Sequence, residues 1–281
     1  MRILLFLILL VLLLLAALAL WRWSDLRRDR AEMDRLRGLV AEASGRFDPA
    51  MVADLPAPAR RFFEGAIRPG TPLYRVAEIE MTGRFDLGSL EAPRPLEMQA
   101  RQVLAGVQGF LWQARMRGGM RVSGSDSEGW TRFWLAGLIP VARVGGDADH
   151  RRSAFGRSVA EAVIWLPSSV LPQPGVTWEA VDDQRARVTI TRDGMEQSAE
   201  ITLNAAGHAV EITLPRWSNA NSEKTYRVQP FGGTLSDHRE VGGLVIPFAA
   251  EVGNHVGTAD YFPFFKARLT DVRFPGLADS P

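Results

Sequence analysis

The sequence contains no cysteine among its 281 residues. This absence excludes disulfide bonds, thiol catalysis and cysteine-ligated metals, and it excludes a lipid attached to a cysteine behind a signal sequence. The sequence also lacks a charge excess, because 33 Lys and Arg residues are balanced by 32 Asp and Glu residues. Nucleic-acid-binding proteins usually carry a basic surplus, so we exclude that class of function.

Metal-binding patterns and internal repeats are absent as well. The chain has four histidines, none with the spacing of a metal-binding pair: His150, His208, His238 and His255. We therefore expect no metal site and no cofactor. No segment repeats with a period of about twenty to fifty residues, which argues against a solenoid or a propeller.

Residues 3–21 carry no charge and are mostly leucine. As a helix this segment would be ~28 Å long at ~1.5 Å per residue, close to the thickness of a bilayer core. Residues 1–23 are therefore a transmembrane anchor or a cleaved signal peptide, since Ala17, Leu18 and Ala19 resemble a cleavage site. We favour a retained anchor, because the apolar run continues to Trp21 without a polar break.

The charges beside this segment bear on the side of the membrane that the domain occupies. One arginine precedes the segment and six follow it: Arg2, then Arg22, Arg27, Arg28, Arg30, Arg35 and Arg37. The positive-inside rule would place the domain in the cytoplasm. The signal-like apolar region favours the opposite side. We expect an inner-membrane protein with an extracytoplasmic domain.

The rest of the chain divides into three parts. Residues 24–47 are predicted to form a charged helical linker, residues 48–276 a single β-rich domain, and residues 277–281 a C-terminal tail. Two short helices open the domain. The first starts at Asp48 and Pro49, where aspartate caps the helix and proline takes its first position. The second starts at Pro58.

Alternating apolar and polar residues then predict antiparallel strands. Ile79, Met81 and Phe85 alternate with polar residues, which is typical of a half-buried strand. Asp193 and Gly194 indicate a two-residue hairpin turn. Residues 130–138 leave two structures open, because Trp130, Trp134 and Leu138 recur every four residues. They fit a short helix ending at Pro140 or a wide strand.

Residues 151–172 form the segment around which we expect the domain to be organised. The first part reads as an amphipathic helix that ends at Leu166 and Pro167. A lone helix within a long series of strands usually forms the layer that covers the sheet. The predicted fold is therefore mainly β (α+β), a curved antiparallel sheet or half-barrel wrapped around a central helix.

Aromatic residues are the strongest sign of a binding site. Rigid aromatic walls are common around apolar ligands, and tryptophan is rarely buried without a partner for its indole N–H. We predict an apolar, lipid-like ligand or an envelope partner for a membrane-anchored, non-enzymatic binding domain. The predicted lining consists of Trp112, Trp134, Phe155, Trp165 and Trp178.

Two alternatives remain from other functional classes. The first is a hydrolase-like enzyme, in which Glu161 acts with Asp183 or His238 as acid and base. It requires these groups to converge on one pocket, whereas Glu161 can instead pair with Arg157 one helical turn earlier. The second is a structural module of the cell envelope that binds another protein. The oligomeric state is left open.

Several segments in order resemble an uncharacterised bacterial family of unknown function with an N-terminal membrane anchor. The similar segments are LPAPARRFF at 55–63, GFLWQA at 109–114, and residues 160–172, 176–183 and 241–252. The resemblance covers residues 55–274 and implies no catalytic residue. The general layout is also similar to the half-barrels of periplasmic lipoprotein carriers, a similarity at the level of the fold.

Overall fold

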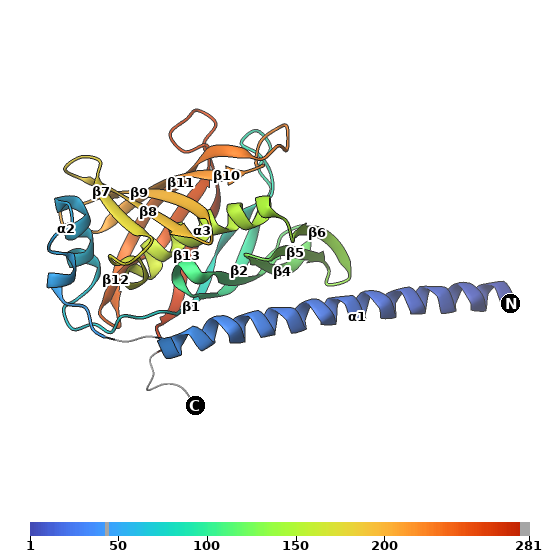
Figure 1. The fold of residues 1–281 in the computed structure, drawn as a ribbon. Coiled ribbons are helices and arrows are strands. Elements are labelled where there is room, and N and C mark those ends of the chain that lie inside the picture. The colour runs from blue at the N-terminus through green and yellow to red at the C-terminus, as the bar shows by residue number, and fades with distance from the viewer. Residues whose placement is uncertain (43–44, 276–281) are drawn as a thin grey trace.

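The computed structural model describes residues 1–42 and 45–275, and its main element is one antiparallel sheet of thirteen strands (Figure 1). The mainly β architecture predicted from the sequence is confirmed. The described residues also form three α-helices, α1 (Arg2–Gly38), α2 (Ala57–Ala66) and α3 (Ala148–Trp165). The predicted tail at 277–281 lies outside the described residues.

The strands follow one another in two meanders. The first comprises β1 (Ala77–Asp86), β2 (Pro95–Leu104), β3 (Phe110–Arg117), β4 (Arg121–Ser127), β5 (Trp130–Leu135) and β6 (Ile139–Gly145). The second comprises β7 (Val176–Ala180), β8 (Arg185–Arg192), β9 (Met195–Leu203), β10 (Ala209–Ser218), β11 (Arg227–Val241), β12 (Leu244–Asn254) and β13 (Phe262–Arg273). β1 pairs with β13 and so joins the meanders, which leaves β6 and β7 as the two edges.

Helix α3 connects these two edge strands, so the chain must cross the inner face of the sheet. It contacts β2 and β6 of the first meander and β9, β10 and β12 of the second. Figure 1 shows the sheet bending around the helix. The core therefore contains buried residues of α3, such as Phe155, Val159 and Val163, together with residues of both meanders.

The ends of α3 follow from local sequence. The Asp147 carboxylate accepts a hydrogen bond from the His150 backbone N–H at 2.7 Å, so the helix begins at Ala148, earlier than the predicted residue 151. At the other end, Pro167 cannot continue the helix and opens a 3₁₀ turn, Pro167–Val170. The predicted break at Leu166 and Pro167 is confirmed.

Residues 130–138 form a strand and a turn, not the short helix that their spacing also allowed. A spacing of four residues is even, so it places side chains on one face of a strand as well as of a helix. Trp130 and Trp134 both project from the outer face of β5 toward α1. Pro140 fits because β6 is an edge strand.

Helix α1 runs without interruption through the predicted anchor and into the predicted linker, where it ends at Gly38. Its apolar part is long enough to cross a membrane, with a mean hydropathy of 3.5 over an 18-residue window and no buried residue there. Its second half lies on the outer face of the sheet, where Asp25, Asp29, Met33 and Leu36 are buried.

Short helices complete the described chain. Three are 3₁₀ turns in connections: Leu39–Glu42, Pro49–Val52 and Gly106–Gln108. Asp48 caps the second of these, as predicted, through a 2.9 Å bond from the Ala50 N–H. Helix α2 follows at the predicted place. Its Phe62 and Phe63 are buried against the sheet.

Candidate functional site

An apolar cavity of about 630 Å³ lies between α3 and the inner face of the sheet. Strands of both meanders and one face of α3 contribute to its wall. Its aromatic residues are supplied by five strands and by the end of the helix: Phe85, Trp112, Phe133, Trp165, Phe231, Phe264 and Phe265. The crossing of α3 from edge to edge thus creates the space in which a ligand can be enclosed.

Trp112 on β3 is at the centre of the aromatic wall. Its ring centroid lies 6.1 Å from that of Phe85 and 6.2 Å from those of Phe133 and Phe265. These tilted and edge-on contacts hold the rings in place, and aromatic side chains have few rotatable bonds that must be ordered. The indole N–H of Trp112 is buried and has no acceptor among the described residues.

One side of the cavity carries a group of charged side chains centred on Arg157 of α3. Its guanidinium donates to Glu161 at 2.7 Å and to Asp126 at 2.6 Å. Gln102 donates to the second oxygen of Glu161 at 2.5 Å. Burial alone would lower the pKa of Arg157, but the two carboxylates outweigh burial and raise it. Arg157 is therefore a fully paired cation.

Arg216 on β10 is a cation in the same wall without such pairing. No carboxylate among the described residues lies within 4.0 Å of its guanidinium. Its Nε donates a long hydrogen bond of 3.4 Å to the Ser153 carbonyl, and its guanidinium carbon lies 4.7 Å from the centroid of the Phe231 ring. Burial, assisted by the charge of Arg157, lowers the pKa of Arg216 to about 10. It therefore remains charged at neutral pH inside a mostly apolar wall.

Two of the five predicted lining residues, Trp112 and Trp165, lie in the cavity wall. The other three do not. Trp134 faces α1 on the outside of the sheet, where its indole N–H donates to Asp25 at 3.0 Å. Phe155 lies beneath the Arg192 guanidinium. Trp178 packs on α2, 5.2 Å from Phe63, and it donates to a backbone carbonyl of the segment after α3.

The acid–base groups of the enzyme alternative do not converge. Glu161 faces the cavity, but its carboxylate pairs with Arg157. The enzyme alternative required a Glu161 without this pairing. Asp183 lies in the turn between β7 and β8. His238 on β11 stacks on His208 at 4.9 Å, and burial lowers the pKa of His238. No group of three potential metal ligands occurs in the described ranges 1–42 and 45–275.

Sequence reasoning missed the phenylalanines of β1, β5, β11 and β13 and missed Arg216. The signal for Arg216 was present, because Ile212, Leu214, Arg216 and Ser218 share one face of β10. An arginine in the inward phase of a strand marks a polar group directed at the core. The phenylalanines gave a weaker signal, since any core contains such residues.

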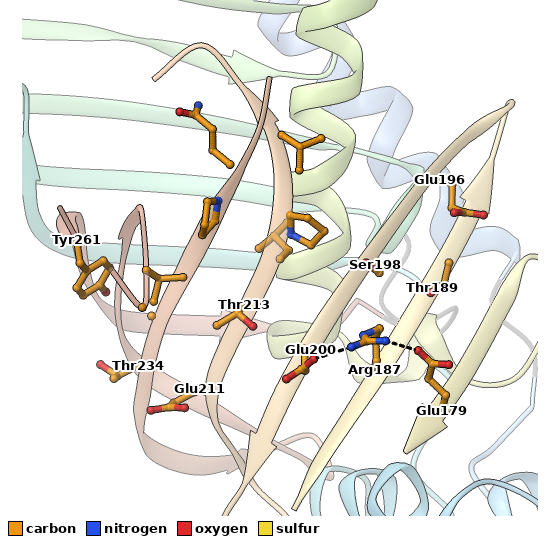
Figure 2. Close-up of a pocket in the computed structure, with 18 residues that line it drawn as sticks. Glu179, Arg187, Thr189, Glu196, Ser198, Glu200, Glu211, Thr213, Thr234 and Tyr261 are labelled. Carbon is orange, nitrogen blue, oxygen red and sulfur yellow. Dashed lines mark hydrogen bonds and ion pairs between the residues drawn. The ribbon is translucent and has the colours of Figure 1, made fainter. Parts of the chain in front are cut away.

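A second, larger hollow of about 930 Å³ lies on the outer face of strands β7 to β11 (Figure 2). Figure 2 shows polar side chains there, with α3 behind the sheet. Its arginine, Arg187, donates to Glu179 at 2.7 Å and to Glu200 at 3.1 Å. This hollow carries more polar side chains than the inner cavity, and its arginine is paired with two carboxylates.

The fold and the cavity define a mainly β domain that encloses an apolar space and follows an apolar N-terminal helix. The chain belongs to DUF6544, a family of unknown function, which matches residues 45–267. This confirms the resemblance seen in the sequence. No curated protein matches the chain.

Solved structures of similar fold share little sequence with the chain. A putative outer membrane lipoprotein-sorting protein domain from Vibrio parahaemolyticus is 10% identical with a TM-score of 0.38, over 77% of this chain and 90% of that one. A LolA superfamily protein from Nitrosomonas europaea is 11% identical with a TM-score of 0.39, over 78% and 94%. A DUF1329 family protein from Desulfovibrio piger is 10% identical with a TM-score of 0.41, over 77% and 90%.

Proposed function

We propose that this protein is a membrane-anchored, non-enzymatic binding protein whose inner cavity holds an amphiphile with an apolar chain and an acidic head group. The observation that carries the proposal is the combination of an aromatic cavity with an arginine in its wall, Arg216, that has no carboxylate partner among the described residues. The cavity volume of about 630 Å³ lies within the range of small-molecule pockets, ~300–1,000 Å³.

The apolar wall supports the chain of the ligand. A chain buried against Trp112, Trp165 and the phenylalanines would remove apolar surface from water on both sides, which is favourable by ~25 cal/mol per Å². Met116 and Ile164 add flexible and branched aliphatic contacts to the same wall. Such a surface imposes few directional constraints, so it fits a hydrocarbon chain better than a polar metabolite.

Arg216 supports the acidic head. A half-buried charge without a counter-ion carries a desolvation cost, and a carboxylate or phosphate that pairs with Arg216 removes much of that cost. The planar guanidinium can donate two parallel hydrogen bonds to such a group. Asp126 and Glu161 are not counter-ions of Arg216, because both carboxylates pair with Arg157.

The continuity of α1 supports a retained membrane anchor. The residues that resemble a cleavage site, 17–19, lie within the helix, which continues to Gly38 and packs on the sheet. We infer that residues 1–23 stay attached and hold the domain at the inner membrane, on the extracytoplasmic side. The helix is then part of the folded domain as well as an anchor.

The binding proposal can be tested by photolabelling the full chain in lipid nanodiscs. The probe is palmitic acid with a photoreactive diazirine on its chain, and mass spectrometry maps the labelled peptides. We expect label on cavity residues. The variant Ala142→Trp places a large side chain in the cavity and should abolish this labelling. The control variant Ala180→Trp, at an exposed position of β7, should leave the labelling unchanged. Absence of cavity label would overturn the proposed function.

The head group is tested separately with Arg216→Met and with the alcohol analogue of the probe. Loss of a charge-assisted bond of ~1.5–3 kcal/mol predicts about tenfold or greater loss of acid labelling in the variant, with little change for the alcohol. Arg187→Met on the outer face is the control. If acid and alcohol label the natural protein equally and Arg216→Met changes neither, the acidic head is refuted while the apolar site stands.

A further inference from the structure

The second half of α1 is fastened to the outer face of the sheet by buried charges. Asp25 is 2% exposed and accepts from Arg132 at 3.1 Å and from Arg143 at 2.7 Å. Asp29, one turn later, accepts from Arg132 at 2.5 Å and from Ser125 at 2.8 Å. Because these bonds are numerous and buried, the apolar part of α1 leaves the domain in a fixed direction.

The β5–β6 hairpin lies where α1 leaves the sheet. Trp21, the last residue of the apolar run, packs edge-on against Trp134 of β5 at 5.6 Å. Arg143 of β6 covers the Trp21 ring at 4.5 Å. Tryptophan at the end of a membrane helix marks the boundary between hydrocarbon and head groups. The hairpin therefore reaches the level of the bilayer surface.

The hairpin and the neighbouring β3–β4 turn expose large apolar side chains at this level. Leu138 is 45% exposed, Ile139 55% and Val141 53%, and Met120 in the β3–β4 turn is 49% exposed. The two turns are neighbours because Val122 of β4 pairs with Leu135 of β5. Figure 1 shows the hairpin extending beside α1 toward its N-terminus.

Basic residues flank these apolar side chains. Arg117 and Arg121 lie opposite each other on β3 and β4, at the two ends of the β3–β4 turn. Both residues are exposed. No Asp or Glu occurs from residue 98 to residue 125. Apolar tips beside arginines match the two layers of a membrane surface, acyl chains beneath and phosphates above.

We propose that Met120, Leu138, Ile139 and Val141 insert into the surface layer of the leaflet that α1 enters, with Arg117 and Arg121 against its phosphates. The occupant of this apolar patch is thus the bilayer itself, because the patch is continuous with the membrane helix. Met120 and Val141 also line the cavity. If the proposed function holds, the cavity opens toward the leaflet and takes its ligand directly from the membrane.

The absence of cysteine allows a direct test on the full chain. Ile139→Cys carries an environment-sensitive fluorophore, and the protein is reconstituted in vesicles of phosphatidylcholine and phosphatidylglycerol that contain a lipid with a quencher near its head group. The matched control is Val228→Cys, an apolar residue of β11 that is 52% exposed. Equal melting temperatures verify that both variants fold.

We expect blue-shifted emission and several-fold stronger quenching at Ile139 than at Val228. Equal quenching at the two positions, whether weak or strong, would overturn the membrane contact. The outcome is independent of the ligand site. If Ile139 is quenched but no probe labels the cavity, the membrane contact stands and the proposed binding function fails.

Discussion

Asp25 and Asp29 are spaced like any pair of charges on an exposed helical linker, yet both are buried. The pKa of Asp25 shows what holds it there. Burial would raise that pKa, but Arg143, Arg132 and the Trp134 N–H outweigh burial and hold it below its usual range. The carboxylate thus receives its hydrogen bonds from Arg132, Trp134 and Arg143, more than a hundred residues away in the chain.

Removing this carboxylate should loosen α1 from the sheet. Asp25→Ala leaves the buried Arg132 and the more exposed Arg143 short of counter-charge, and breaking a buried pair typically costs ~3–5 kcal/mol. We expect a lower unfolding free energy and faster proteolysis between α1 and the domain. Asp34→Ala on an exposed position of the same helix should change neither, and equal effects at both positions would contradict this account.

At the scale of elements, local patterns predicted most of the described structure. The alternation around Ile79 and the turn at Asp193 and Gly194 were sufficient for strands and hairpins, because their causes are local. Pairings between distant segments were not predictable in this way. Nothing near β1 or β13 indicates that the two strands pair. Met33, Leu36 and Val40 recur at helical spacing and so indicate a buried helical face, but not that this face docks on the sheet from β2 to β5.

The candidate site was predictable only in part for the same reason. Trp112 and Trp165 were found because large aromatic residues in a strand and a helix usually face the core. Trp134 was misplaced because a strand has two faces, and its outer face is covered by α1 instead of solvent.

The N-terminal cap of α3 provides a test at this scale. Asp147→Ala removes the acceptor for the His150 N–H, and loss of such a cap costs ~1 kcal/mol. We expect a corresponding shift in chemical denaturation with an unchanged slope. Asp147→Ser keeps a capping oxygen and should restore most of the loss. A variant Asp147→Ala as stable as the natural protein would show that the cap is dispensable.

The molecule as a whole combines a long N-terminal helix, apolar in its first half and docked on the sheet in its second, with an inner cavity. Its orientation in the membrane can be measured with reporters fused after residue 281. We expect activity from a reporter that functions only outside the cytoplasm and none from one that functions only inside. The reverse result would place the domain in the cytoplasm, as the positive-inside rule predicts from the arginines that follow residue 21.

Because α1 is unbroken, its length sets the position of the domain relative to a membrane that its apolar half would cross. No loop separates the part that would cross the lipid from the part fastened to the sheet, so every residue between Trp21 and Asp25 adds an axial distance of ~1.5 Å and a turn of ~100°. Lengthening the helix there by about two turns, ~7 residues, would keep the domain facing the same way while lifting it ~10 Å off the surface. The distance between the domain and the membrane surface therefore depends on the length of this one helix.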